Sequence, residues 1–151
     1  MITRIMSSPT NPPGSGTPPV LAERVIVVVE DDATVRAMTS TYLRRSGATV
    51  HNAENGRDAL ALLQTLSSSG TAVHAVLCDL RMHGGSGMEL HRQLRECLPK
   101  LVARIIFFSG DVESDDVRTF VEQSAVAVIP KPYPLAELRR QLAELPPPPL
   151  T

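Results

Sequence analysis

Short aliphatic runs alternate with stretches of helical periodicity five times along this chain, and this alternation limits the possible folds more than any other feature of the sequence. The runs are continuous and rich in valine and isoleucine, which is typical of strands buried on both faces of a sheet. The expected strands cover residues 24–29, 48–53, 73–78, 103–108 and 125–129. The expected helices cover residues 33–45, 57–66, 88–98, 115–123 and 135–145. Five β–α units in succession predict an α/β fold, with a doubly wound, five-stranded parallel sheet and helices on both of its faces.

Proline is concentrated at the two ends of the chain, and this sets the limits of the folded part. Of the 13 prolines among 151 residues, five lie within residues 1–19 and four form the run Pro146–Pro149. Residues 1–20 are rich in proline, serine and glycine and bury too little apolar surface to offset the entropy of ordering, so we expect a disordered tail. We expect one domain over residues 21–145 and a proline-rich C-terminal tail over residues 146–151, because proline stops the last helix.

Charge and residue usage argue against several classes of function. The 15 basic and 16 acidic side chains leave a net charge of −1, which argues against a nucleic-acid partner. The longest purely aliphatic run, Val25–Val29, is far too short to cross a membrane, and the first ten residues lack the apolar stretch of a secretory signal. Cys78 and Cys97 form no CxxC pair and the four histidines show no metal-binding spacing, so neither a zinc site nor a disulfide is expected. A reducing, cytoplasmic location fits this cysteine usage best.

Polar residues follow four of the five expected strands, at the point where each strand ends. These groups are Glu30-Asp31-Asp32, Asp79, Ser109-Gly110-Asp111 and Lys131-Pro132. In an open parallel sheet, ligands bind beyond the carboxyl ends of the strands, so we expect these side chains to form the functional site. Asp32 is interpreted as the N-cap of the helix that follows it. The strand over residues 48–53 is expected at an edge of the sheet.

Three carboxylates, from Glu30, Asp31 and Asp79, are expected to meet at this end of the sheet, where they repel one another unless a cation lies among them. Mg²⁺ suits such oxygen ligands and needs few of them from the protein. Asp79 ends an apolar strand, so its carboxylate is held in place and is a candidate nucleophile toward a phosphoryl donor. Lys131 and the Ser109 hydroxyl are candidates to balance the remaining phosphoryl charge. Lys131 is one of only two lysines among the 15 basic residues, and a compact ammonium fits a small anion pocket better than a guanidinium does.

Four motifs at these strand ends resemble those of one known family. They are VVVEDD at 27–32, LCDLRM at 77–82 with Gly87 downstream, FFSGD at 107–111 and PKPY at 130–133. With these motifs in this order, residues 23–145 resemble the receiver domain of two-component response regulators. The resemblance implies a flavodoxin-like, CheY-like sheet with the strand order 2-1-3-4-5.

By this resemblance Asp79 is the phosphoacceptor, which takes a phosphoryl group from a sensor histidine kinase or a phosphotransfer protein. Glu30 and Asp31 are the acidic pair of the metal site. Mg²⁺ is the implied cofactor, with Asp79 and the backbone carbonyl of Arg81 as further ligands. The implied protein is a single-domain response regulator of a phosphorelay and not an enzyme. It is expected to signal by altered binding of an unidentified partner protein or by onward transfer of the phosphoryl group, with no nucleic-acid or membrane partner.

The resemblance also makes Ser109 the switch hydroxyl and Lys131 the lysine that pairs with the phosphoryl group, with a cis peptide bond between Lys131 and Pro132. Two positions depart from the family pattern. His83 stands where a proline is usual, which predicts a more mobile loop over residues 81–87. Val128 stands where the fifth strand commonly carries a tyrosine or phenylalanine. We therefore expect the signal to use a route other than the coupled movement of a serine and an aromatic ring.

A charged pair is expected over the site. Arg81 and Asp111 lie two residues beyond Asp79 and Ser109, so both should overhang the pocket. We hypothesise that they pair across it and hinder the water that would hydrolyse an acyl phosphate.

Other functions remain as alternatives. Val128 and His83 favour a phosphorylation-independent interaction module with the same fold. A phosphatase-type hydrolase with an aspartyl nucleophile is disfavoured, because such enzymes need a second acid where this chain has Arg81. A flavin-binding protein is disfavoured because the first β–α turn is acidic, whereas a phosphate group is held by Ser, Thr and Gly.

Overall fold

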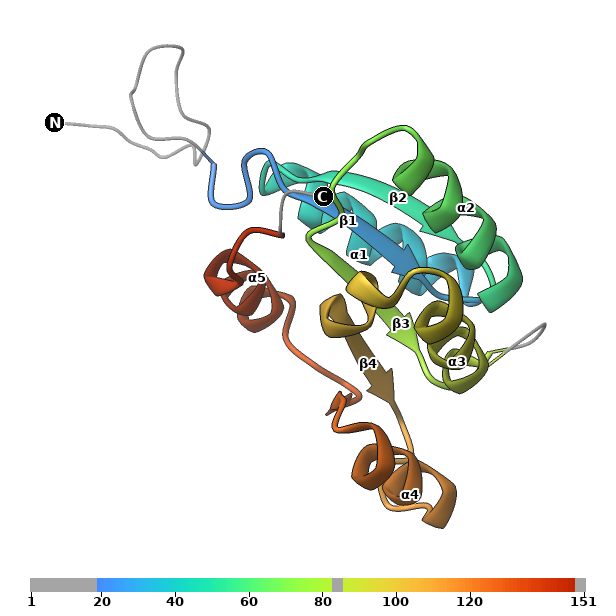
Figure 1. Ribbon diagram of the computed structural model, residues 1–151. Helices are drawn as coiled ribbons and strands as arrows, with labels where there is room; N and C mark the ends of the chain where they lie inside the picture. Colours follow the sequence, from blue (N-terminus) through green and yellow to red (C-terminus); the bar gives the residue numbers. More distant parts are fainter. Residues whose placement is uncertain (1–18, 83–85, 149–151) are drawn as a thin grey trace, which may run out of the picture.

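The computed structural model describes residues 19–82 and 86–148, in which strands and helices alternate in the expected order (Figure 1). The strands are β1 (Val25–Val29), β2 (Thr49–Ala53), β3 (Ala75–Asp79), β4 (Ile105–Ser109) and β5 (Ala127–Pro130). The helices are α1 (Ala33–Arg45), α2 (Gly56–Ser68), α3 (Gly87–Cys97), α4 (Asp115–Ser124) and α5 (Leu135–Glu144), with a short 3₁₀ helix, η1 (Pro99–Arg104), before β4. The tail predicted over residues 1–20 falls almost wholly outside the described residues, as do His83 and the end of the C-terminal tail.

The strands of the described residues form one parallel sheet in the order β2-β1-β3-β4-β5, as predicted. β2 is an edge strand, also as predicted. The chain runs outward from β1 to β2 and then crosses back to β3, so the direction of winding reverses between β1 and β3. Ligands of doubly wound folds bind at this reversal, beyond the carboxyl ends of the two strands.

Helices cover both faces of the sheet and enclose two cores. One core contains α2, α3 and α4 and includes the buried side chains of Val27, Leu63, Val76, Leu90, Leu94, Phe107 and Val117. The other contains α1 and α5 and includes Ile26, Leu43, Leu77, Phe108, Leu138 and Leu142. Because successive residues of a strand point to opposite faces, the continuous aliphatic runs of β1, β3 and β4 supply both cores. In Figure 1, α4 lies at the end of the molecule away from β2.

All five strands begin later than the sequence predicts, and two of the differences have a clear local cause. Residues 99–104 form η1, with Pro99 in its first turn, so β4 begins at Ile105 and not at residue 103. Ala125 adopts a left-handed conformation (φ 54°), and its N–H donates to the Val121 carbonyl at 2.9 Å. This arrangement ends α4 in the manner of a C-cap and delays β5 to Ala127.

Two arginines tie the end of α5 to the amino ends of the strands. Arg24, just before β1, donates to the carbonyl oxygens of Leu145 and Ala143 at 3.2 and 2.9 Å. Arg104, just before β4, donates to the carbonyl oxygens of Pro146 and of the proline after it at 2.6 and 2.7 Å. The bonds of Arg24 satisfy carbonyl groups that the end of a helix leaves without partners, and those of Arg104 fix the chain that follows the helix.

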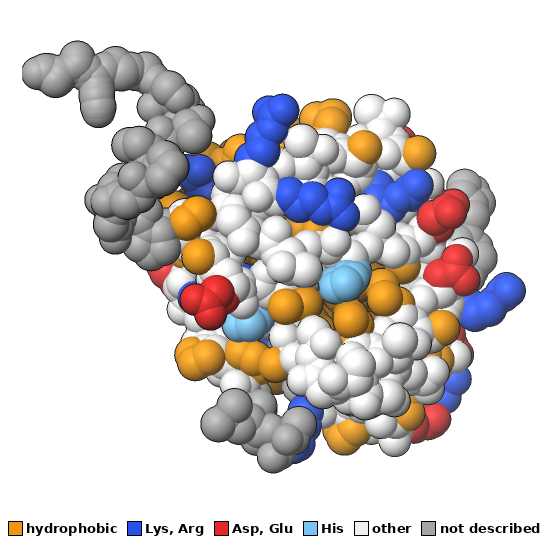
Figure 2. All heavy atoms as spheres, turned by 90° about the horizontal axis from the view of Figure 1, so that it is seen from above, with side chains coloured by type: hydrophobic (Ala, Val, Ile, Leu, Met, Phe, Trp, Pro, Cys, Tyr) orange, Lys and Arg blue, Asp and Glu red, His pale blue; other side chains and the backbone are white. Residues whose placement is uncertain are grey.

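The surface carries charges of both signs. Figure 2, seen from above Figure 1, shows basic side chains gathered over one part of this face and acidic side chains toward its rim. None of the described helices has the length and apolar character needed to cross a membrane.

Candidate functional site

The chemically active side chains lie at the carboxyl ends of four neighbouring strands. Glu30 follows β1, Asp79 is the last residue of β3, Ser109 is the last residue of β4, and Lys131 follows β5. These strands are adjacent and parallel, so their carboxyl ends meet at one edge of the sheet. The topology thus brings together residues that are up to 101 positions apart in the sequence.

Glu30, Asp31 and Asp79 form an acidic cluster in which one carboxylate oxygen of each lies within 4.8 Å of the others. The side chains of Glu30 and Asp79 are only 8% and 11% exposed, so water screens their mutual repulsion poorly. Such a set of close carboxylate oxygens fits the ligand preference of Mg²⁺. The backbone of Arg81 adjoins the cluster, because its N–H donates to Asp79 Oδ1 at 3.2 Å.

Lys131 bridges two of the three carboxylates. Its Nζ lies 2.9 Å from Asp79 Oδ2 and 3.2 Å from Glu30 Oε1. The backbone N–H of Lys131 also donates to the Ser109 carbonyl at 2.8 Å, which fixes the start of this loop against the end of β4. The peptide bond between Lys131 and Pro132 is cis, as predicted.

The charges of the cluster perturb one another. Burial and the nearby charge of Asp79 raise the pKa of Glu30, although hydrogen bonds from the Asp32 backbone and from Lys131 act in the opposite direction. Partial burial by itself lowers the pKa of Lys131, but its bonds and charge interactions with Asp79 and Glu30 outweigh this, so that the pKa is raised. The ammonium is therefore held charged, and the acidic cluster remains one that gains from a further cation.

Ser109 lies beside the cluster but is bonded elsewhere. Its side chain is buried, and its Oγ accepts a hydrogen bond from the Asp111 backbone N–H at 3.0 Å. The Ser109 hydroxyl is thus at the expected strand end. Because it only accepts in the bond with Asp111, its own O–H can still donate to a phosphoryl oxygen.

The first turn of α1 supports the acidic cluster from behind. Asp32 is the N-cap of α1, as predicted, and its Oδ1 accepts hydrogen bonds from the N–H groups of Thr34 and Val35. Arg36, which the sequence analysis did not identify, donates to the Glu30 carbonyl at 2.8 Å. Its position four residues after the cap, one helical turn along, was the signal in the sequence.

The hypothesis that Arg81 pairs with Asp111 is wrong about the partner. The Arg81 guanidinium donates to Asp116 Oδ1 at 2.8 Å and to Ser114 Oγ at 3.1 Å. Both partners belong to the start of α4, which brings them toward the β3–α3 connection, whereas Asp111 contributes only the longer-range effect of its charge. The side chains of Arg81 and Asp116 are about half exposed, at 50% and 57%.

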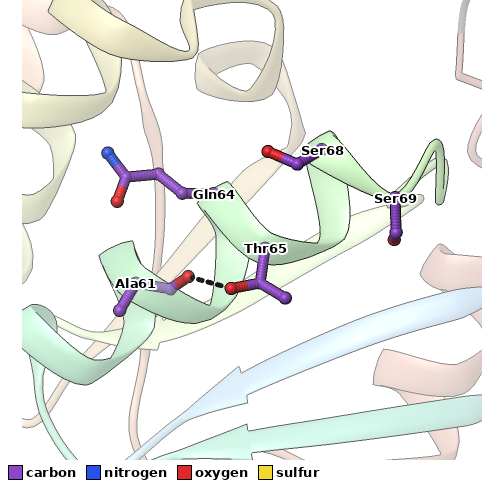
Figure 3. A pocket seen from close by; sticks show the side chains of 5 residues that line it. All are labelled: Ala61, Gln64, Thr65, Ser68 and Ser69. Atoms are coloured by element: carbon purple, nitrogen blue, oxygen red, sulfur yellow. Dashed lines mark hydrogen bonds between the residues drawn. The ribbon is translucent and has the colours of Figure 1, made fainter.

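Two hollows in the described surface lie away from the acidic cluster. One, of about 580 Å³, is formed by α2 and its C-cap, and Figure 3 shows its uncharged side chains, with Thr65 Oγ1 donating to the Ala61 carbonyl. The other, of about 350 Å³, includes residues from the ends of α2 and α3, from η1 and Pro148. Neither is lined by any residue of the predicted site.

Comparisons with known proteins identify the family and agree with the fold. The model of the response regulator receiver domain family matches residues 26–143. The sensor kinase CckA of Brucella abortus (strain 2308) is 32% identical over 120 residues, which cover 80% of this chain and 12% of the kinase. A response regulator receiver protein from Pseudomonas putida, at 27% identity, has a TM-score of 0.67 and covers 80% of this chain and 95% of its own. The response regulator TrrA of Thermotoga maritima, solved in complex with Mg²⁺–BeF, has a TM-score of 0.65 at 23% identity, with 82% and 99% of the two chains covered.

The chain spans less than half the length of the curated relatives that it matches, which include sensor kinases and transcriptional regulators.

Proposed function

This chain belongs to the response regulator receiver domain family, and on that premise we propose that it accepts a phosphoryl group on Asp79. Receiver domains are signalling modules of two-component systems, and they take phosphoryl groups from sensor histidine kinases. The single observation that carries the proposal is the position of Lys131 Nζ, 2.9 Å from Asp79 Oδ2. In this position the Lys131 ammonium contacts Asp79, which ends the fully buried strand β3 and belongs to the acidic cluster.

In the proposed transfer, a carboxylate oxygen of Asp79 attacks the phosphorus of a phosphohistidine. A P–O bond forms as the P–N bond breaks, and the imidazole of the donor leaves with the electron pair and takes up a proton from solvent. The Lys131 ammonium then neutralises part of the charge on the phosphoryl oxygens. The Ser109 hydroxyl donates its O–H to another of these oxygens, which is compatible with the bond that its Oγ accepts from the backbone N–H of Asp111.

The residues proposed to hold Mg²⁺ are Glu30, Asp31 and Asp79, together with the backbone carbonyl of Arg81. The close carboxylate oxygens of the cluster support this proposal, as does the raised pKa of Glu30, which burial and Asp79 cause. When bound, Mg²⁺ supplies positive charge that offsets the carboxylates and the equatorial phosphoryl oxygens.

We further propose that residues 21–145 act as a single receiver domain in the cytoplasm. Its donor would be a sensor histidine kinase or a phosphotransfer protein, and its output would be altered binding of a partner protein or onward transfer of the phosphoryl group. Leu21 is fully buried and Arg24 bonds to the Leu145 carbonyl, so contacts of the folded body reach both proposed boundaries.

Intact-mass analysis after incubation with acetyl phosphate tests the proposal. We expect one phosphoryl adduct on the wild-type chain, dependent on Mg²⁺ and absent from Asp79→Asn. Asp115→Asn is the matched control, because it makes the same chemical change at a side chain that is 96% exposed on α4. This control should form the adduct to the wild-type extent.

The same measurement decides between the proposal and its alternative. A folded protein that binds Mg²⁺ but forms no adduct, either with acetyl phosphate or with a histidine kinase, would be a phosphorylation-independent interaction module. Val128, in place of the usual aromatic residue on β5, is the observation that favours this alternative.

A further inference from the structure

Three aromatic rings from three elements meet beside β4. The Phe120 ring of α4 packs edge-on against the Phe107 ring of β4, with 5.4 Å between ring centroids. His91 of α3 lies 5.2 Å from Phe120 and 6.1 Å from Phe107. The rings of this aromatic cluster, defined as His91, Phe107 and Phe120, connect α3, β4 and α4, and Figure 1 shows α4 at the end of the molecule away from β2.

The aromatic cluster reaches the proposed phosphoryl site through backbone contacts. Phe107 lies two residues before Ser109, so both side chains point to the same face of the sheet. On its other side the Phe107 ring touches Gly87, the first residue of α3. A Cβ added there would lie 3.0 Å from Phe107 Cε1 and 2.8 Å from the Asp79 carbonyl oxygen. The atoms around Gly87 are closely packed. A shift of the backbone at the end of β3 or β4 therefore also moves the Phe107 ring.

The aromatic cluster occupies the neighbourhood of the missing aromatic residue of β5. Val128 is the partner of Phe107 in the register of β4 and β5, so it faces the same side of the sheet. Both Val128 and Phe120 are half-buried and pack against the same core. The ring that lies next to Phe107 thus belongs to α4 instead of β5, and it moves with that helix.

The buried imidazole of His91 makes the present arrangement of the aromatic cluster less stable than it would be with a hydrogen-bond partner for Nε2. It is 3% exposed, and its Nε2 has no hydrogen-bond partner among the residues that the structure describes. A buried polar atom left without a partner destabilises the fold, because it has given up its hydrogen bonds to water. Its neighbours on β4 and α4 are the apolar rings of Phe107 and Phe120, and the charged group that acts on it is Arg95 of its own helix. A movement of α4 that admits water to Nε2 recovers part of this cost.

We propose that the aromatic cluster is the internal switch of this receiver, and that a phosphoryl group on Asp79 displaces Phe107 and Phe120 with α4 and exposes His91 to water. The inference rests on the proposed function, because it needs the phosphoryl group. In the phosphorylated state Ser109 turns toward the phosphoryl oxygens, the end of β4 shifts, and the Phe107 ring carries this shift to α4. The contact of His91 with Phe120 then opens.

His91, which is buried, and His74, which is half-buried, report the movement in one NMR experiment. Burial and Arg95 lower the pKa of His91, and burial with Arg24 and Arg104 lowers that of His74, which lies just before β3, at the amino ends of the strands. Their side-chain resonances are titrated with Mg²⁺ alone and with Mg²⁺–beryllofluoride as a stable phosphoryl mimic, whose binding the ¹⁹F spectrum shows directly. We expect the pKa of His91 to rise toward the ordinary histidine value of about 6.5 when the mimic binds, while His74 stays unchanged.

Two phenylalanine variants separate the switch from a merely structural role. Phe120→Leu should bind the mimic and form the acetyl phosphate adduct as the wild type does, but the pKa of its His91 should no longer respond. Phe108→Leu makes the same change on the next residue of β4, whose side chain belongs to the opposite core, and its His91 should respond normally.

The outcomes are distinct. If the mimic binds and the adduct forms, but the wild-type His91 does not respond, the switch is refuted and the proposed phosphoacceptor function stands. A response that persists in Phe120→Leu also refutes it. If neither the adduct nor the bound mimic is seen, the proposed function fails and the switch fails with it.

Discussion

Removal of the Lys131 ammonium should destabilise the Mg²⁺-free protein by a measurable amount. Lys131→Met keeps most of the apolar stem but leaves Glu30 and Asp79, both nearly buried, without their bridging cation. Breaking a buried ion pair in this way costs about 3–5 kcal/mol. The Lys131 side chain is 29% exposed, and allowing for solvent screening we expect a loss of about 2 kcal/mol in the free energy of unfolding.

Thermal unfolding in EDTA measures this loss. For a domain of this size, a loss of 2 kcal/mol lowers Tm by about 7 °C. Lys100→Met is the matched control, because Lys100 is the only other lysine of the chain and its side chain is exposed on η1. It should change the stability by less than about 0.5 kcal/mol. Mg²⁺ should reduce the difference in Tm between Lys131→Met and the wild type, because a bound cation then neutralises the carboxylates in place of the ammonium.

The pH dependence of this difference in stability gives a second check. The bonds of Lys131 to Asp79 and Glu30 raise its pKa from an ordinary value of 10.5. The contribution of Lys131 to the free energy of unfolding is therefore fully present below pH 10.5, and it is lost only as the pH rises through the folded-state pKa. The difference should therefore be constant between pH 7 and 9. Equal melting temperatures of Lys131→Met and wild type in EDTA would refute the reasoning, as would a difference that Mg²⁺ leaves unchanged.

Three further outcomes are expected. In the native protein a thiol reagent such as Ellman's should modify the exposed Cys97 but should react with Cys78 only on unfolding. Burial raises the pKa of the Cys78 thiol and blocks access to it. Two fast-reacting thiols in the native protein would contradict this. Gly87→Ala should lower the stability by about 1–3 kcal/mol in denaturant unfolding, because its Cβ would meet a backbone oxygen at 2.8 Å, whereas Gly110→Ala, with nothing within 4 Å, should not. Glu30→Gln should raise Tm in EDTA at pH 7, because burial and the charge of Asp79 raise the pKa of Glu30. The gain in Tm should shrink as the pH falls toward 4.5, where the wild-type carboxyl takes up its proton in both the folded and the unfolded protein. A gain independent of pH would point to a cause other than charge.

The order of elements and the meeting of the site residues could both be predicted from the sequence, for different reasons. The aliphatic run at Val25–Val29 and the periodicity at Ala33–Arg45 are local signals, and the structure places both elements within one residue of their predicted limits. The approach of Lys131 to Glu30 is not local, but it follows from topology. Once the strands are parallel and in a known order, their carboxyl ends must lie together.

Contacts that depend on how far a side chain reaches could not be predicted. Arg81 has a long, exposed side chain, and whether it meets Asp111 or Asp116 depends on where α4 begins and how its first turn is oriented. The aromatic cluster is of the same kind. His91 and Phe120 each have the inward spacing expected of their own helix, but their contact exists only once α3 and α4 pack against β4.

The hydrogen bonds from Arg24 and Arg104 to carbonyl oxygens in and after the last turn of α5 have a practical consequence for attaching labels. Both arginines precede strands, so the chain beyond Leu145 leaves from the amino ends of the sheet, roughly one five-residue strand, or about 16 Å, from the acidic cluster. A fluorescent protein or an affinity handle joined after residue 148 would therefore project from the pole opposite Asp79. A kinase approaching that carboxylate would find it unobstructed, which makes this end of the chain the suitable one for reporters of phosphotransfer.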